Sequence, residues 1–343
     1  MNVTLTFRDR SISIVASPNE SILEAARRQG VALVADCTLG LCGTCKSRLV
    51  KGTVEADEPN PRGLTYSDRR AGYVLTCSVQ ATSDVTLEFD YASERLTRGP
   101  AIAFKGAVSG RCQVANAVMR LSIELCGDTP LAFDPGQYAN IRIPGTDSMR
   151  SFSFVNAPGS KHLDFLIRVL PHGVMSDYLR TRVKLGESIE FKAPFGKFYL
   201  RPVLRPLIMV AGGTGLAPFL SMLNQLRSLA PVTKQPIRLF YGVTHLKEDL
   251  CCLEELQAFR ASLPDFDFKV AVSQPHAEWT GVTGVVTDLI DSTELFGGAV
   301  DAYLCGPPRM VEKSLDVLTR LGVPREGIFN EEFLPSEALL DQT

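Results

Sequence analysis

The alternation of apolar and polar residues changes character twice along the chain. Near the start, "VTLTF" and "SISIV" alternate on either side of "RDR", which predicts a β-hairpin. A helix is predicted over "ILEAARRQ", because Ser21 and Glu24 have capping-box spacing and Gly30 follows as a stop. The alternating segments "YVLTCSV" and "DVTLEF" complete a small α+β unit, which we expect to span residues 1–95.

From residue 100 to residue 202 the pattern consists of short alternating strands separated by Gly and Pro turns. Examples are "MRLSIELCG", "QYANIRIPG" and "ESIEFKAPFG", and one helix is predicted within "VMSDYLRTRV". Many short strands with frequent turns favour an antiparallel β-barrel.

Residues 203–343 combine buried-strand runs with amphipathic helices. Strands are predicted at "PLIMVAGG", "IRLFYGV", "FKVAVS" and "DAYLCG", and helices at "APFLSMLNQLRSL", "KEDLCCLEELQAFRASL" and "RMVEKSLDVLTRLG". Alternating strands and helices predict a parallel sheet covered on both faces. The expected fold is therefore multidomain, α+β followed by α/β.

Composition narrows the function classes. The chain has 343 residues, of which 45% are hydrophobic and 22% charged, with a net charge of −2. This balance argues against a nucleic-acid binder with a broad basic face. No apolar run approaches the roughly 18 residues of a membrane span, and "MNVTLTFRDR" carries charges where a signal peptide has an apolar core. We therefore expect a cytoplasmic protein without a membrane partner.

Three of the nine cysteines crowd into "DCTLGLCGTC". Cys37, Cys42 and Cys45 have the spacing C-x4-C-x2-C, and Cys77 follows later, which is the plant-type [2Fe–2S] pattern. The four histidines all lie beyond residue 161, so this region offers no mixed zinc site and no Rieske centre. A four-cysteine zinc site remains the alternative. Gly40 and Gly43 are expected to adopt the positive φ angles of a loop that turns amide groups toward sulfur.

Two motifs point to a flavin. "RSFSF" (150–154) and "HGVMSDYL" (172–179) resemble the R-x-Y-S and G-x-x-S motifs of the ferredoxin–NADP reductase superfamily. The resemblance implies that Arg150 pairs with the FAD diphosphate, that Phe152 replaces the stacking tyrosine and that Ser153 lies near flavin N5. It further places along the FAD Ile167, Arg168, Val169, Gly173, Val174, Met175 and Ser176.

A nucleotide site is predicted from two segments in the last third of the chain. "PLIMVAGGTGLAPFLSML" takes a buried strand into a glycine loop and a helix, which lets a diphosphate approach backbone amides. "YLCGPP" ends another strand at the carboxyl edge of the sheet, where open α/β folds bind ligands. The expected nicotinamide-nucleotide contacts are Gly212, Gly213, Thr214, Gly215, Ser273, Gln274, Cys305, Gly306 and Pro307.

The resemblance assigns further roles. It places Cys305 beside the nicotinamide, Glu331 of "FNEEF" as a positioning or proton-relaying group, and Phe333 over the flavin. Ser153, Cys305 and Glu331 are the catalytic candidates. NADH is preferred to NADPH because Gln274 stands where NADPH-dependent relatives usually carry arginine.

Over nearly its whole length the chain resembles the reductase components of bacterial aromatic-ring-hydroxylating dioxygenases, of the benzoate and anthranilate type. The resemblance implies a β-grasp ferredoxin domain (1–95), an FAD barrel (100–202) and an NAD(P) domain (203–343). Electrons would pass from NADH through FAD and the [2Fe–2S] cluster to an oxygenase partner, most plausibly a Rieske dioxygenase, which docks near Thr38–Leu41. The alternatives are a reductase for a diiron monooxygenase or for a deoxysugar dehydratase, and a non-enzymatic redox sensor or zinc-stabilised interaction module.

Overall fold

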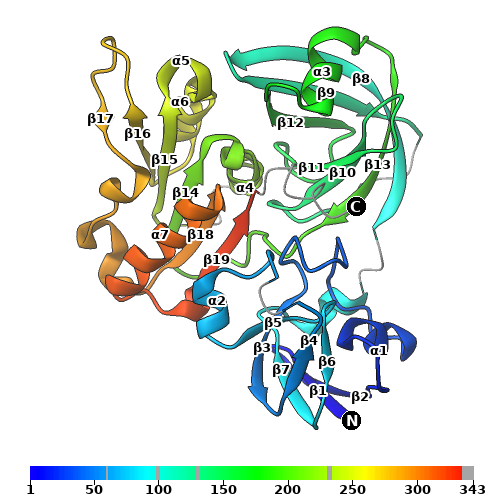
Figure 1. Cartoon of the computed structure of the whole chain (residues 1–343). Coiled ribbons are helices and arrows are strands. Elements are labelled where there is room, and N and C mark those ends of the chain that lie inside the picture. The colour runs from blue at the N-terminus through cyan, green and yellow to red at the C-terminus, as the bar shows by residue number, and fades with distance from the viewer. Residues whose placement is uncertain (59–60, 98–100, 128–130, 230–233, 334–343) are drawn as a thin grey trace. The chain divides into compact units, whose positions relative to one another are not determined.

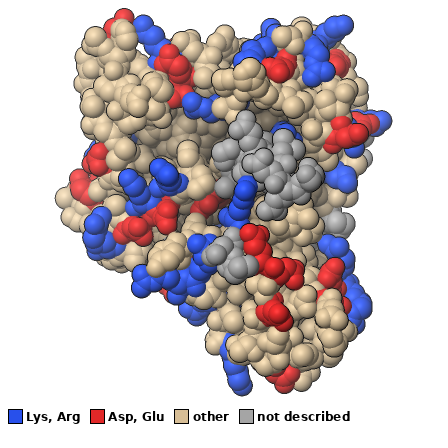
Figure 2. Space-filling view, in the orientation of Figure 1, with Lys and Arg blue, Asp and Glu red and all other residues tan. Residues whose placement is uncertain are grey.

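The computed structural model describes residues 1–58, 61–97, 101–127, 131–229 and 234–333. It divides into two compact units, one formed by Met1–Ala101 with Phe195–Lys197 and the other by Ile102–Pro194 with Phe198–Phe333 (Figure 1). No helix in the described ranges is both long and apolar enough to cross a membrane. On the face seen in Figure 2, Lys and Arg are interspersed with Asp and Glu.

The first unit is built on a mixed five-stranded sheet of order β2-β1-β7-β3-β5, with a second small sheet of β4 and β6. Its elements are β1 (Asn2–Thr6), β2 (Ser11–Val15), α1 (Ile22–Arg28), β3 (Lys46–Lys51), β4 (Val54–Ala56), α2 (Tyr66–Arg70), β5 (Tyr73–Leu75), β6 (Val79–Ala81), β7 (Val85–Glu88) and η1 (Ser93–Thr97). The predicted hairpin is present, because β1 and β2 pair antiparallel.

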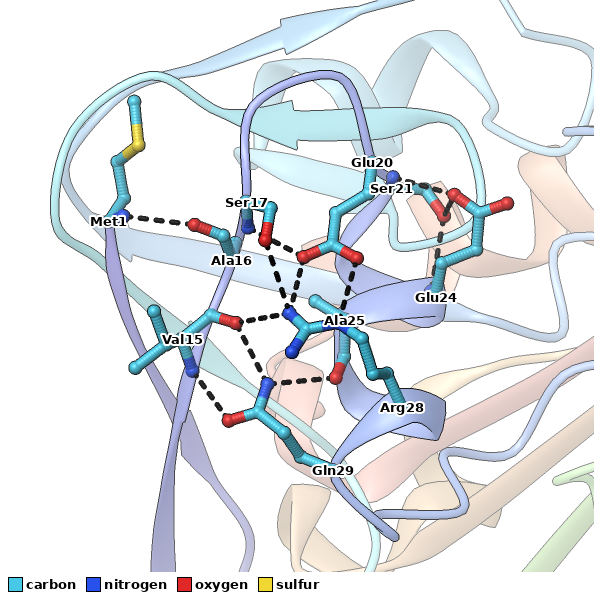
Figure 3. Close-up of polar contacts among 10 residues, drawn as sticks. All are labelled: Met1, Val15, Ala16, Ser17, Glu20, Ser21, Glu24, Ala25, Arg28 and Gln29. Atoms are coloured by element: carbon cyan, nitrogen blue, oxygen red, sulfur yellow. Dashed lines mark hydrogen bonds and ion pairs between the residues drawn. The ribbon is translucent and has the colours of Figure 1, made fainter.

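Helix α1 begins as the sequence predicts. The Ser21 hydroxyl accepts from Glu24 N at 3.2 Å, and the Glu24 carboxylate accepts from Ser21 N at 2.9 Å, which completes the capping box. The adjoining turn is fixed by Glu20, which accepts from Ser17 N at 2.6 Å and from Arg28 Nη2 at 2.6 Å (Figure 3). These contacts connect the end of β2 to both ends of the helix.

The second unit contains an antiparallel sheet of order β11-β10-β13-β8-β9-β12. A bridge between Phe154 and Phe165 brings the first and last strands of that order together and closes the predicted barrel. Its elements are β8 (Ile102–Ala115), β9 (Val118–Leu125), β10 (Tyr138–Arg142), β11 (Met149–Ser153), β12 (His162–Arg168), α3 (Val174–Asp177), the π-helical turn η2 (Tyr178–Arg182) and β13 (Ser188–Phe195).

The rest of the second unit contains a parallel sheet of order β17-β16-β15-β14-β18-β19. Its elements are β14 (Leu207–Gly212), η3 (Gly213–Leu216), α4 (Ala217–Ser228), β15 (Ile237–His245), α5 (Leu246–Asp249), α6 (Leu253–Ser262), β16 (Phe266–Gln274), β17 (Val282–Thr283), η4 (Val286–Leu289), η5 (Ser292–Gly298), β18 (Asp301–Gly306), α7 (Pro308–Arg320), η6 (Arg325–Gly327) and β19 (Ile328–Glu332).

Both faces of this sheet are covered, as predicted. Along β14, Met209 belongs to the core that includes α4 and α6, whereas its neighbours Ile208 and Val210 belong to the core that includes α7 and η4. This alternation is the two-residue period of a strand with helices on either side. The strand order reverses between β14 and β18, so the loops after these strands open a crevice at the carboxyl edge of the sheet.

The helix predicted over "KEDLCCLEELQAFRASL" is wrong in one respect. The structure has two helices there, α5 and α6, separated at Leu250–Cys252. Cys252 adopts a left-handed backbone conformation with φ of 59°, which ends any continuous helix.

Candidate functional site: cluster, flavin and nucleotide sites

The four predicted cluster ligands lie in two pairs. Cys45 Sγ and Cys77 Sγ are 3.2 Å apart, although their residues are far apart in the chain. Cys37 and Cys42 form the second pair, in which the hydrogen bond from Cys42 outweighs burial and lowers the pKa of Cys37 to about 6. In the same way, the hydrogen bond from Cys45 lowers the pKa of Cys77 to about 6. Each pair therefore contains one thiol poised as a thiolate.

Backbone amides surround the Cys37 sulfur. Leu39 N and Leu41 N donate to Cys37 Sγ at 3.4 Å each, and Cys42 N donates at 3.3 Å. The loop reaches this shape through the positive φ angles of Gly40 (73°) and Gly43 (71°), which confirms the prediction made for them. Converging amides stabilise negative charge on sulfur, as a bound iron–sulfur cluster requires.

The pairing fits two metal ions better than one. In a zinc site all four ligands converge on a single ion. A [2Fe–2S] cluster instead takes four thiolates spread over two irons. The two thiol pairs and the amides on Cys37 thus fit a cluster held by Cys37, Cys42, Cys45 and Cys77.

One cation near this loop was missed by the sequence reasoning. Lys197, from the short segment that belongs to the first unit, donates to Lys46 O at 3.2 Å and lies 3.7 Å from an Asp90 carboxylate oxygen. Burial lowers the pKa of Lys197. Lys46 directly follows Cys45, but nothing in "PFGKFYLR" signals that its lysine reaches a chain segment so distant in sequence.

Arg150 and Ser153 both lie on β11. Among the described residues, Arg150 has no carboxylate partner and the Ser153 hydroxyl has no hydrogen-bond partner. In the described part of the chain, the guanidinium of half-buried Arg150 donates only to Met149 O, at 2.8 Å, and burial lowers its pKa. The Ser153 hydroxyl, at 4% exposure, is buried and finds no hydrogen-bond partner among the residues that the structure describes. A buried hydroxyl without a partner and a half-buried cation without an anion are costly unless a ligand completes them. Both fit a flavin dinucleotide.

The second flavin segment follows β12. Gly173 precedes α3, and a Cβ on Gly173 would lie 2.9 Å from Ser176 Oγ, which itself accepts from Leu170 N at 2.9 Å. Met175 and Ser176 are buried, whereas Val174 is exposed. The remaining positions predicted along the FAD behave differently from one another: Ile167 is buried, Val169 is half-buried and Arg168 is exposed.

The structure gives the Arg168 side chain a specific partner in the nucleotide domain. Arg168 Nη1 lies 2.7 Å from Oδ1 of Asp249, whose side chain is 1% exposed. The same nitrogen is the nearest atom to a Cβ built on Gly213, at 3.9 Å. The Arg168 guanidinium therefore lies beside the glycine loop, whereas the sequence placed this residue along the flavin.

The glycine loop and the "LCGPP" segment meet at the crevice between β14 and β18. A Cβ on Gly215 would lie 2.3 Å from Cys305 O, and a Cβ on Gly212 would lie 2.8 Å from Pro307 Cδ. The chain can therefore close here only with glycine at these positions. Gly212 ends β14 and Gly213–Leu216 form a helical turn, so Gly213 and Thr214, both half-buried, line the start of a helix.

Cys305 and Glu331 are brought together by parallel strands. They are register partners on β18 and β19, and burial, followed by the charge of Glu331, raises the pKa of Cys305 well above its usual value. Cys305 is fully buried, and Phe333 N donates to Gly306 O at 2.9 Å. The residues predicted from "YLCGPP" and "FNEEF" therefore share one edge of the sheet.

Ser273 and Gln274 are exposed at the end of β16, on the carboxyl edge of the same sheet. Gln274 Oε1 lies 2.9 Å from His245 Nε2, a contact that the sequence reasoning missed. Their pairing follows from register, because His245 ends β15 opposite Gln274.

Three family models match the chain in the expected order. They are the 2Fe-2S iron-sulfur cluster binding domain over residues 5–82, the oxidoreductase FAD-binding domain over residues 105–199 and the oxidoreductase NAD-binding domain over residues 209–315. The toluate 1,2-dioxygenase electron transfer component of Pseudomonas putida is 38% identical over 94% of this chain and 95% of its own length. The anthranilate 1,2-dioxygenase electron transfer component of Acinetobacter baylyi is 36% identical over 98% of each chain.

The chain belongs to the family of dioxygenase electron transfer components. Among solved structures, the Amycolatopsis cytochrome P450 reductase GcoB superposes with a TM-score of 0.72 at 27% identity, covering 97% of this chain and 99% of that one. An electron transfer component of this family uses a [2Fe–2S] cluster, FAD and NAD, and each of the three has a matching family model in this chain. The cofactors expected from the motifs are thus confirmed, whereas the individual contact residues stay predictions.

Proposed function

We propose that this electron transfer component oxidises NADH and delivers the electrons singly, through FAD and its [2Fe–2S] cluster, to a Rieske aromatic-ring dioxygenase. The observation that carries the proposal is the pairing of four thiols, three from one amide-lined loop and Cys77 from the turn after β5, with the Cys45 and Cys77 sulfurs 3.2 Å apart. Such a centre exchanges one electron at roughly −400 mV. It converts a hydride-accepting flavoprotein into a one-electron donor.

The flavin supplies hydride acceptance and single-electron release, and the residues of β11 hold it for that task. Arg150 binds the diphosphate as a charge-assisted pair. The Ser153 hydroxyl donates a hydrogen bond to the reactive nitrogen edge of the ring, and Phe152 covers the ring by stacking. Gly173 lets the backbone approach, so that the amides of Val174–Ser176 take the remaining phosphate oxygens.

The nucleotide enters the crevice between β14 and β18. Gly212–Gly215 receive its diphosphate, and Cys305, Gly306 and Pro307 bound the nicotinamide. The closeness of Gly215 to Cys305 supports this arrangement, because it leaves the end of the crevice shaped by backbone atoms. Glu331 positions the carboxamide of the nicotinamide or relays a proton, and Phe333 shields the flavin.

NADH is proposed as the physiological donor. The lysine that follows β15, Lys247, lies 3.3 Å from Glu278, so its charge is already engaged by a carboxylate. With the neutral Gln274 at the end of β16 and Lys247 paired, neither residue offers a free cation to a 2′-phosphate.

A dioxygenase is favoured over a monooxygenase as the partner. The dioxygenase electron transfer components match at 34–38% identity, whereas the reductase components of monooxygenases match at 30–32%. A diiron monooxygenase or a deoxysugar dehydratase remains the alternative acceptor. Domain limits of 1–95, 100–202 and 203–343 are part of the proposal, and the three family models fall within or close to them.

The cytoplasm is the proposed location. All nine cysteines are free, and two of them, Cys112 and Cys126, are exposed. Exposed thiols persist in a reducing compartment, and the proposed electron donor NADH is a coenzyme of that compartment.

Anaerobic reduction by NADH tests the proposal. Purified protein should show flavin and iron–sulfur absorption and should reduce cytochrome c with NADH. Cys77→Ser should abolish cytochrome c reduction while NADH still bleaches the flavin, because the cluster is the exit for electrons. Cys112→Ser, at an exposed thiol outside the sites, is the matched control. Loss of flavin bleaching in Cys77→Ser would contradict the proposed electron order, and zinc without flavin would refute the whole proposal.

A further inference from the structure

A histidine stands between two acceptor oxygens at the nucleotide edge of the parallel sheet. His245 Nε2 lies 2.9 Å from Gln274 Oε1, and His245 Nδ1 lies 3.5 Å from Asp249 Oδ2. The same carboxylate oxygen accepts from His245 N at 3.0 Å, which holds the ring at the junction of β15 and α5. Asp249 is buried, whereas the His245 side chain is 45% exposed.

With the Gln274 oxygen turned toward the ring, both ring nitrogens face acceptor oxygens, and both oxygens are satisfied only when both nitrogens carry protons. A neutral imidazole has one N–H and one lone pair, so it satisfies one of two acceptor oxygens and faces the other with its lone pair. Protonated His245 donates to Gln274 through Nε2 and forms an ion pair with Asp249 through Nδ1. The Gln274 amide nitrogen then points away from His245 as a donor.

When His245 loses its Nε2 proton, the side-chain amide of Gln274 must rotate by half a turn. The buried Asp249 carboxylate retains the Nδ1 proton, which leaves a lone pair on Nε2. Gln274 must then turn its NH2 group toward His245, and its carbonyl oxygen faces outward as an acceptor. One proton thus changes both the local charge and the hydrogen-bonding sense of the exposed amide.

Most of the charged side chains described near His245 have partners of their own, apart from the exposed Glu248 on α5. Asp249 is shared with Arg168 of β12, at 2.7 Å. Lys247 lies 3.3 Å from Glu278, and His276 lies 3.8 Å from the same carboxylate.

Resting on the proposed function, in which Gln274 faces the adenosine ribose, we propose that His245 selects between NADH and NADPH according to its protonation. Neutral His245 presents the Gln274 oxygen, which accepts from the ribose 2′-hydroxyl of NADH and repels a 2′-phosphate. Protonated His245 presents the amide NH2 beside a positive charge, which accommodates the 2′-phosphate of NADPH.

The test is the ratio of kcat/KM for NADPH to that for NADH, from about pH 8.5 to about pH 6, across the range where histidine changes charge. The ratio should rise roughly tenfold as pH falls, the size of one charge-assisted hydrogen bond. In His245→Asn the ratio should no longer rise as pH falls. The pH dependence that remains should be only that of the NADPH 2′-phosphate, which itself titrates near pH 6. His276→Asn, at the exposed histidine nearby, should keep the wild-type rise.

Two further measurements keep the outcomes separate. His245→Arg should raise the NADPH ratio at every pH, and flavin absorbance per protein should match the wild type in all three variants. A wild-type ratio that does not change with pH, or a rise that persists in His245→Asn, would overturn the proposed role of His245. NADH-driven flavin reduction would still support the proposed function in that case. Failure of both nucleotides to reduce the flavin would overturn the proposed function, and the proposed role of His245 with it.

Discussion

Gly215 lies directly against the backbone of Cys305, so closely that a Cβ on Gly215 would lie 2.3 Å from the Cys305 oxygen. Two loops that follow neighbouring strands of a parallel sheet are thereby held in contact at the point where the strand order reverses. The nucleotide crevice therefore depends on one residue having no side chain.

Gly215→Ala should cripple NADH use without removing FAD. The added methyl group must displace the Cys305 carbonyl or the loop, and a displacement of about 1 Å costs on the order of a hundredfold in rate. Stopped-flow reduction of the flavin by NADH measures the effect. Gly110→Ala, where the new Cβ would be 3.4 Å from its nearest neighbour, is the control. Near wild-type reduction in Gly215→Ala would refute the assigned crevice.

Arg150→Met should weaken FAD binding by roughly 10- to 100-fold, since one charge-assisted interaction is lost. The ratio of flavin to protein after gel filtration reports it. Arg150→Lys should restore the charge but not the paired geometry. The control is Arg142→Met, because Arg142 lies on the adjacent strand β10 and already pairs with Asp147 at 3.4 Å. Equal flavin content in both Met variants would remove Arg150 from the flavin site.

The cysteine loop makes a separate prediction about the oxygenase partner. Leu39 is 71% exposed, while Leu41 in the same loop is buried, so Leu39 is the apolar group that a partner can reach. Leu39→Ser should slow electron delivery to the oxygenase severalfold, because Thr38–Leu41 carry no charged side chain and the core of an interface is apolar. NADH-dependent reduction of cytochrome c, which also depends on the cluster, should not change. A parallel loss with both acceptors would mean that the substitution disturbs the cluster instead.

Glu20 predicts a pH effect confined to the first unit. Its hydrogen bond with Arg28, followed by that from the Ser17 backbone, lowers the pKa of Glu20 to about 2. A lowered carboxyl pKa contributes stability that is present above the unfolded value and lost as pH falls toward about 2. Glu20→Gln should therefore ease opening of α1 at neutral pH by less than about 1 kcal/mol, as for a surface ion pair.

Hydrogen exchange of the α1 amides measures this difference. The gap between wild type and Glu20→Gln should shrink as pH falls below about 4.5, the ordinary glutamate range. Glu58→Gln, at an exposed carboxylate, should leave α1 exchange unchanged. A gap that persists in acid would show that Glu20 acts through packing and not through charge.

Much of the fold could be predicted from short-range patterns in the sequence. The cap at Ser21 and the covered strands of the parallel sheet follow from short-range patterns, and Cys77 is recognisable because cluster spacing is a chemical constraint. Asp249 was not recognisable, because "KED" on a helix has the pattern of a solvated face. In the structure its side chain is 1% exposed and pairs with Arg168, which belongs to a strand of the barrel, and it also contacts His245.

The break at Cys252 was missed for a different reason. Its residues suit a helix individually, and the backbone separates α5 from α6 through an extended Leu250 and a left-handed Cys252 with φ of 59°. Helix propensity sums over residues and does not reveal a single left-handed position. Asp249 reaches His245 within α5 itself, as an i,i+4 pair, and the break at Cys252 comes after it.

The distance of 3.2 Å between the Cys45 and Cys77 sulfurs has a consequence for biogenesis. A cluster bound there clamps together two positions separated by 32 in sequence, and so encloses β3, β4, α2 and β5 in one loop. Tying the ends of such a loop removes disorder from the unfolded chain. Iron–sulfur insertion should then act as a folding checkpoint: chains that miss it keep this loop open to proteases and are cleared before they can draw on the NADH pool.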